Sequence, residues 1–209
     1  MKNAINFGRL FLLLFAIVSI SATKYAATLS KEERKFVAHH LKQTQKELLK
    51  SVKGLSEAQL NFKATPEKWS VKECMQHLAL AEAGLWMWVD GTLKTPANPD
   101  KRTDIKMTDD DVLNGVSNRG NKAQAPENFQ PKNARWATME ETVSAFKTER
   151  GKLISYIKNT TDDMRNHVST ATPLGPVDAY QIVLLISAHT NRHMQQINEV
   201  KANPAFPKE

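Results

Sequence analysis

Apolar residues recur along most of the chain at the three- and four-residue spacing of amphipathic helices, and runs that alternate apolar and polar positions, as a strand would, are absent. Four long stripes have the helical spacing. They extend over residues 37–52, 71–89, 139–157 and 182–200. A cap signature precedes each stripe: Ser, Thr or Asp is followed three residues later by Glu or Gln. The caps are Ser30, Ser70, Thr138 and Asp178. The pattern predicts an almost entirely helical chain.

The spacing of these helices predicts a bundle with unequal connections. Helices of about 20 residues span roughly 30 Å, enough to bury a shared core. About 15 residues join the first helix to the second, whereas about 44 join the second to the third. The longer connection can cross the bundle between two parallel helices, and we expect a short helix within it at residues 108–115. The predicted fold class is all-α, a four-helix bundle with a long crossover between helices 2 and 3.

The first 23 residues have the layout of a secretory signal peptide. Lys2 and Arg9 precede an apolar run, LFLLLFAIVSI, that small residues follow. The run is shorter than the roughly 20 apolar residues that a spanning helix needs, so we expect cleavage, with an uncleaved anchor as the alternative. The predicted organisation is a signal peptide over residues 1–23 and a bundle domain over residues 28–203. We expect export to the periplasm or outside the cell, without stable membrane insertion after cleavage.

Charge and cysteine content exclude several classes of protein. The formal net charge is +7, and loss of the signal segment lowers it to about +5. The lysines are scattered among acidic neighbours, as on solvated helix faces, so we expect no nucleic-acid partner. Asp109 to Asp111 lack the spacing of a calcium loop and are interpreted as a charged helix start. A single cysteine excludes an intrachain disulfide and a zinc site of several thiolates, so any metal must be held by nitrogen or oxygen.

His189 and His193 are the first candidate metal ligands. Residues four apart lie on one face of a helix, about 6 Å apart at Cβ. Ile186 and Ile197 share that face, which directs both imidazoles into the bundle. Buried imidazoles need a hydrogen-bond partner or a metal, because an unsatisfied buried polar group costs about 1–3 kcal/mol. Two core histidines that bond to carbonyl groups, or an exposed pair, remain alternatives at this point.

His77 on the second helix supplies a third nitrogen. Ala81 and Gly84 lie on the same face, and such small residues are expected to leave room for a cavity beside the ring. A lone histidine on an apolar face is more often a core residue. One histidine from one helix and a pair from another, however, make a three-nitrogen site with an open position. Zinc, nickel or ferrous iron would accept such ligands.

Three neighbouring features have structural interpretations beside functional ones. Glu73 could be a base, but its role in the cap of the second helix already explains it. Cys74 could face the same cavity as His77, although a small apolar residue in the core is the simpler interpretation. Three tryptophans could line the mouth of a pocket or simply belong to the core. They are Trp86, Trp88 and Trp136.

Several ordered motifs resemble the DinB-like family of bacterial helical bundles. The first half contains GLSEAQLNFK from Gly54, PEKWS from Pro66 and then His77-Leu78. The second half contains His189, Arg192, His193, Gln196 and Ile197, similar to the family's closing H-x-x-R-H-x-x-Q-I pattern. The resemblance extends over residues 31–201. It implies a four-helix bundle with a long second crossover, often a homodimer, and a divalent metal held by His77, His189 and His193.

The resemblance leaves the reaction open. Relatives resemble metal-dependent hydrolases or transferases that use low-molecular-weight thiols. Such thiols are chiefly cytoplasmic, so the signal segment favours a metal-dependent hydrolase acting on a small-molecule substrate of unidentified kind. A non-catalytic helical module that binds metal or a small ligand is the alternative from another class, and a thiol-dependent transferase is a third.

Overall fold

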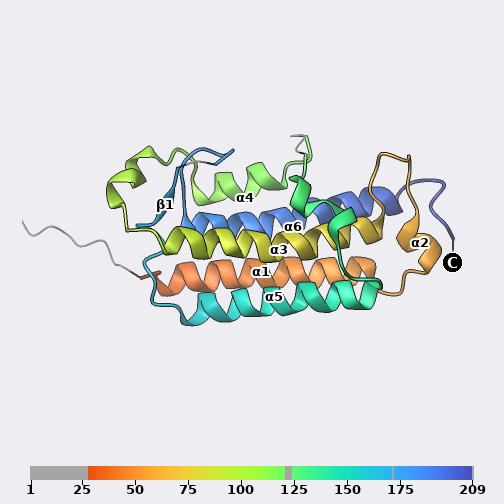
Figure 1. Cartoon of the computed structure of the whole chain (residues 1–209), viewed down its shortest axis with the longest axis horizontal. Helices are drawn as coiled ribbons and strands as arrows, with labels where there is room; N and C mark the ends of the chain where they lie inside the picture. Colours follow the sequence, from red (N-terminus) through yellow and green to blue (C-terminus); the bar gives the residue numbers. More distant parts are fainter. Residues whose placement is uncertain (1–27, 121–123, 171, 209) are drawn as a thin grey trace, which may run out of the picture.

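Four long helices lie side by side in the computed structural model, which describes residues 28–120, 124–170 and 172–208 (Figure 1). They are α1 (Lys31–Val52), α3 (Val71–Leu93), α5 (Met139–Asn159) and α6 (Ala179–Lys201). A complete capping box opens each one, at the four residues predicted: Ser30, Ser70, Thr138 and Asp178. Each box satisfies backbone N–H groups that the first turn leaves unpaired, which fixes where the helix begins. The all-α bundle is confirmed.

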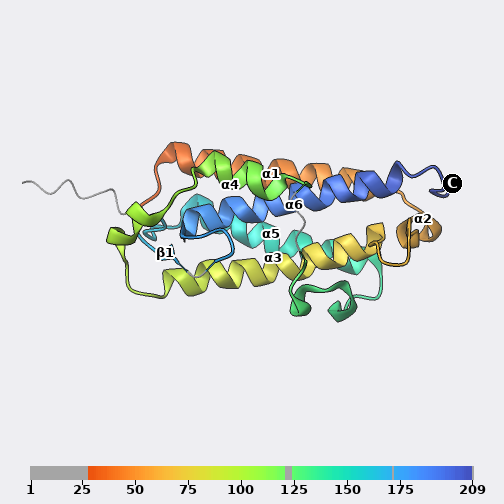
Figure 2. The same ribbon diagram turned by 90° about the horizontal axis from the view of Figure 1, so that it is seen from above.

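The long crossover joins two parallel helices. α3 and α5 run in one direction along the bundle, and α1 and α6 run in the other (Figures 1 and 2). α6 packs against α1 and α3, and α5 packs against the same two helices from the other side. The chain must therefore travel the length of the bundle between Leu93 and Met139, as predicted.

The described residues of the crossover form four short elements. They are η1 (Pro99–Asp104), α4 (Asp109–Ser117), η2 (Glu127–Phe129) and η3 (Pro131–Asn133). The predicted short helix is α4; it has Thr108 as its cap and Asp109 to Asp111 in its first turn. α4 packs along α6, whereas η2 and η3 lie against α3. The crossover therefore covers both helices that carry the candidate ligands.

Neither α2 (Glu57–Asn61) nor the small β-hairpin was predicted. α2 lies in the connection from α1 to α3, and β1 (Val168–Ser169) pairs with β2 (Val177–Asp178) in an antiparallel hairpin. Two-residue strands are too short to produce an alternating pattern in the sequence. The Trp88 indole donates to Ser169 Oγ at 3.2 Å, which ties the hairpin to α3. None of the helices described has the length and apolar composition needed to cross a membrane. The predicted signal peptide lies outside the described residues.

A buried polar layer divides the core into two apolar clusters. One cluster includes Leu41, Val89, Leu153 and Ile182, and the other includes Leu48, Leu78, Phe146 and Ile197. On every helix, residues of the polar layer lie between these two sets. We define the polar layer as Thr44, Glu82, Arg150, Ser187 and Thr190.

Arg150 is the centre of this polar layer. Its side chain is fully buried, and its guanidinium forms a two-point ion pair with Glu82, with Nη2 at 2.8 Å from Oε2. Nη1 donates to the Leu41 carbonyl at 2.9 Å and to Thr44 Oγ1 at 3.1 Å. Nη2 also donates to Thr190 Oγ1 at 2.7 Å. One side chain of α5 thereby bonds to α1, α3 and α6.

Arg150→Met is expected to lower the free energy of unfolding by about 3–5 kcal/mol, because it leaves the Glu82 carboxylate buried without its partner. The measurement is urea denaturation. The matched control is Lys94→Ala, which breaks the exposed pair with Asp90 and should cost far less. The double variant Arg150→Met, Glu82→Leu should regain much of the loss. A loss for Arg150→Met no larger than that for Lys94→Ala would contradict this role.

Candidate metal centre

The structure brings the three predicted histidines together. His77 lies on α3, and His189 and His193 lie one turn apart on α6. Their Nε2 atoms converge: His189 Nε2 is 3.1 Å from His77 Nε2 and 3.1 Å from His193 Nε2. One ring nitrogen from each residue lies within 4.8 Å of the other two. Within the part of the chain that the structure describes, this is the one group of three or more His, Cys, Asp or Glu with metal-binding spacing. We call these residues the histidine cluster.

The other ring nitrogens of two members fix their tautomers. His77 Nδ1 lies 2.8 Å from the Phe129 carbonyl, and His193 Nδ1 lies 3.0 Å from Gln196 Oε1. Both oxygens can only accept, so both Nδ1 atoms carry the hydrogen. In the neutral rings, Nε2 of His77 and Nε2 of His193 therefore present lone pairs. Outer hydrogen bonds of this kind orient histidines that bind metals.

The converging nitrogens have too few protons to satisfy one another. Both lone pairs point at His189 Nε2, which carries at most one hydrogen when the ring is neutral. It can donate to only one of the two. A cation at the point of convergence would satisfy all three nitrogens, and ligand nitrogens around a tetrahedral zinc at about 2.1 Å stand roughly 3.4 Å apart. The separations of 3.1 Å are close to that value.

Burial keeps the histidine cluster uncharged. His77 and His193 are 2% and 7% exposed, whereas His189 is partly exposed. Burial lowers the pKa of all three rings. For His189, burial acts together with the charges of His77, Arg192 and Arg150 and lowers the pKa to about 3. The rings are therefore neutral at pH 7, the form in which imidazole binds a metal.

Trp69 forms a wall of the site that the sequence analysis missed. Its ring centroid lies 4.9 Å from that of His77 and 5.9 Å from that of His193, nearly parallel to the latter. The feature of the sequence that could have indicated this role is the position of Trp69 directly before Ser70, the cap of the helix that carries His77. Among the tryptophans considered for a pocket mouth, Trp86 packs on Tyr156 at 4.8 Å and Trp88 bonds to Ser169.

The structural interpretations hold for two neighbours of His77. Glu73 closes the capping box with Ser70, and its Oε1 pairs with Lys63 at 3.1 Å. Cys74 is fully buried in the core, and burial raises the pKa of its thiol. Gly84 was expected to help leave room for a cavity beside the ring of His77, but the ring of Phe129 occupies the space at Gly84. Phe129 was not predicted, since no periodicity marks its loop.

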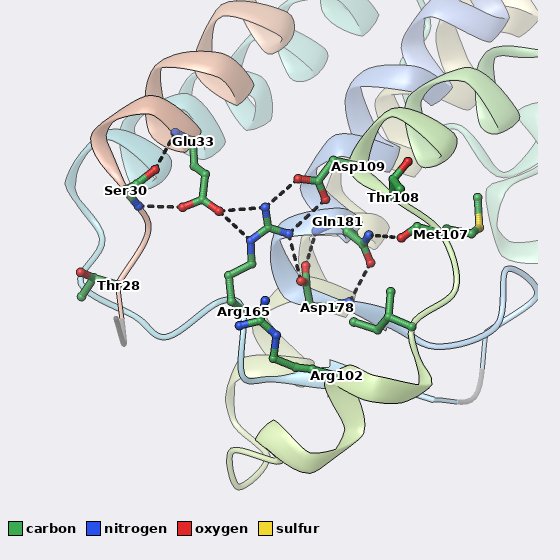
Figure 3. A pocket seen from close by; sticks show the side chains of 11 residues that line it. Thr28, Ser30, Glu33, Arg102, Met107, Thr108, Asp109, Arg165, Asp178 and Gln181 are labelled. Atoms are coloured by element: carbon green, nitrogen blue, oxygen red, sulfur yellow. Dashed lines mark hydrogen bonds and ion pairs between the residues drawn. The ribbon is translucent and has the colours of Figure 1, made fainter. Parts of the chain in front are cut away.

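A polar pocket of about 480 Å³ at the other end of the bundle surrounds Arg165 (Figure 3). Arg165 donates to Glu33 at 2.8 Å, to Asp109 at 2.6 Å and to Asp178 at 3.0 Å. These carboxylates belong to the starts of α1, α4 and α6. Arg165 therefore joins three helix beginnings, and its charge has a structural role.

Comparisons with known proteins identify the family and agree with the fold. The sequence model of the DinB superfamily matches residues 40–197. YuaE, an uncharacterised protein of Bacillus subtilis strain 168, is 25% identical over 150 residues, which cover 72% of this chain and 88% of that protein. The solved structure of YfiT from Bacillus subtilis is similar, with a TM-score of 0.58 and 15% identity, over 83% of this chain and 89% of that one. It is described as a probable metal-dependent hydrolase with an unusual four-helix bundle topology. Because the family model matches well over half of the sequence, the chain belongs to the DinB superfamily.

Proposed function

We propose that this protein is a metal-dependent hydrolase whose divalent ion is held by His77, His189 and His193. One observation carries the proposal: three buried or partly buried Nε2 atoms converge, and the tautomers of His77 and His193 are fixed so that lone pairs point inward. A divalent ion held there would act as a Lewis acid and lower the pKa of a water that it binds, which is the chemistry that hydrolysis needs.

The chain's own residues prepare the site for such an ion. Phe129 O and Gln196 Oε1 hold the rings of His77 and His193 in the ligating orientation. Trp69 packs over the same two rings and limits the access of water to them. His189 is the most exposed member of the histidine cluster, so a substrate would approach from its side. Three imidazole ligands suit zinc, nickel or ferrous iron.

The carboxylates nearest along α3 are already engaged. Glu73 serves the helix cap and pairs with Lys63, and Glu82 is bound to Arg150. Neither is free to act as a general base, so water activation would depend on the ion itself. A module that binds metal without catalysis, and a thiol-dependent transferase, are the alternatives that the first experiment separates.

The description of YfiT supports the proposal by analogy, and the likeness of the two structures concerns the fold. Export through the signal-type segment at residues 1–23 and assembly into a homodimer stay predictions. Cleavage of that segment would place the hydrolase in the periplasm or outside the cell, where low-molecular-weight thiols are scarce.

Purified protein is expected to contain about one divalent ion per chain, and His189→Ala to lose most of it, because two imidazoles hold an ion much more weakly than three. Elemental analysis after gentle purification and re-addition of metal is the measurement. The control is His39→Ala, which changes an exposed histidine outside the histidine cluster and should keep the ion. Absence of metal from the parent protein would refute the proposal.

The same preparations can test hydrolysis. A panel of ester and amide substrates should be turned over by the metal-loaded parent and by His39→Ala, but not after chelation or by His189→Ala. Turnover that appears only when a thiol is added would favour the transferase. Bound metal with no turnover under either condition would favour the non-catalytic module.

The metal-free protein is expected to lose stability as the pH falls below 6.5, the ordinary pKa of histidine. Between that value and the folded-state pKa of about 3, His189 takes up a proton only in the unfolded chain. Each histidine whose pKa is lowered by folding reduces the free energy of unfolding by on the order of 1 kcal/mol per pH unit in this window, and has no such effect above pH 6.5. The measurement is urea denaturation with chelator present, repeated from pH 7 to pH 4. The free energy of unfolding should fall less steeply with decreasing pH for His189→Leu than for the parent. Equal slopes would refute this account.

A further inference from the structure

The orientation of His77 is set by the crossover and not by its own helix. His77 Nδ1 donates to the carbonyl of Phe129, a residue 52 positions further along the chain, at 2.8 Å. Phe129 is the last residue of η2 (Glu127–Phe129). Its own N–H donates to the Pro126 carbonyl at 2.9 Å, and Gln130 N–H donates to the Glu127 carbonyl at 3.1 Å. This short 3-10 turn holds the accepting carbonyl in place.

Gly84 is the place where this turn is anchored on α3. A Cβ atom built on Gly84 would overlap Cε1 and Cζ of the Phe129 ring. Gly84 lies seven residues after His77, two turns along the same face of the helix. It has no positive φ, so no unusual backbone conformation explains a glycine there. A glycine inside a helix costs up to about 1 kcal/mol relative to alanine, and the close approach of the Phe129 ring accounts for it.

The rest of the turn supports the same contact. η3 (Pro131–Asn133) follows η2 after one intervening residue and packs against α3 (Figure 2). Pro131 is buried. Asn133 Nδ2 donates to the Glu127 carbonyl at 2.6 Å, which ties η3 back to η2. Residues 126–133 therefore form one compact unit, which we call the docking turn. Its side-chain contact with α3 at Gly84 and its carbonyl contact with His77 come from the same residue, Phe129.

We propose that the docking turn is a positioning element of the metal centre. Seating the Phe129 ring against Gly84 holds the Phe129 carbonyl on His77 Nδ1, and this hydrogen bond presents His77 Nε2 as a ligand. Phe129 and Gly84 are positioning residues, since both act through His77. One consequence of this inference rests on the proposed function: if His77 binds a metal ion, docking of the turn and binding of the ion stabilise each other. Its structural half, the tautomer of His77, can be measured without any metal.

The first test compares two glycines of α3. Gly84→Ala should push the Phe129 ring away and weaken metal binding by about 10- to 100-fold, the usual effect of losing an outer hydrogen bond to a ligand. Gly91→Ala is the matched control, because a Cβ there meets nothing within 4 Å on the same helix. It should leave the affinity unchanged. The measurement is competition with a chelator for zinc, with folding of each variant checked by circular dichroism. Equal affinities for the two variants would overturn the proposal.

A double-variant cycle tests whether Gly84→Ala affects metal binding through the ring of Phe129. Phe129→Ala keeps the carbonyl but removes the ring and its anchor, so it should weaken zinc binding by itself. In that background Gly84→Ala has no ring to displace, so its effect should largely vanish. An equal fold-change from Gly84→Ala in both backgrounds would show that the glycine acts in some other way and would overturn the proposal. Should Gly84→Ala alone fail to fold, recovery of folding in the double variant would support the ring contact, and failure of both would contradict it.

Nitrogen-15 spectra of the metal-free protein provide a readout that general destabilisation would not change. The parent and Gly91→Ala should show His77 with hydrogen on Nδ1 alone, whereas Gly84→Ala should show a mixture of tautomers. If the parent binds neither zinc, nickel nor ferrous iron but has this tautomer pattern, the proposed function fails, whereas the role of the docking turn in orienting His77 stands. If Gly84→Ala retains the pure Nδ1–H form, the positioning role fails whatever the metal content.

Discussion

The buried ion pair of Arg150 and Glu82 constrains the rest of the structure. A charged pair at the centre of a bundle is stable only when nearly every donor and acceptor is satisfied, because desolvation of the two groups costs several kcal/mol each. The partners of Arg150 come from α1, α3 and α6, so a one-turn slip of any helix would leave a buried polar group without its bond. The two apolar clusters alone could tolerate such a slip far better, because their contacts have no fixed direction. The polar layer between them therefore sets the register of all four helices.

This register places the histidine cluster. Thr190, which accepts from Arg150, directly follows His189, and Glu82 lies five residues after His77 on α3. Fixing these two polar residues against Arg150 fixes the axial positions of α3 and α6, and the Nε2 atoms then meet. The positive charge of Arg150 also contributes to the low pKa of His189, after burial and the neighbouring His77 and Arg192. The group that aligns the helices thus helps to keep His189 in its neutral form.

Local signals in the sequence predicted most of the fold and the members of the histidine cluster, whereas pairings between residues far apart in the chain were not predicted. Capping boxes involve residues three apart, and His189 and His193 share one helix face, so spacing alone revealed them. Glu82 and Arg150 are 68 positions apart, and only their location among apolar residues of a stripe hinted that each is buried and needs a partner. The contribution of Phe129 is a main-chain carbonyl, a group that every residue carries. No residue type could have predicted it, and the small residue that receives its ring, Gly84, was interpreted as a sign of empty space.

The parallel arrangement of α3 and α5 explains how a main-chain carbonyl reaches a histidine inside a bundle. In a bundle of antiparallel neighbours, short loops lie at the ends, and the sides of the helices meet only other helices, whose carbonyls are already bonded within their own turns. A connection between parallel helices must return along the outside, and its irregular backbone has carbonyl groups to spare. Here that return path lies against α3 at η2 and against α6 at α4, the two helices that carry the histidine cluster. His193 finds its acceptor on α6, in the side chain of Gln196, whereas His77 depends on a main-chain carbonyl of the crossover. This links the topology of the chain to the chemistry of its candidate site.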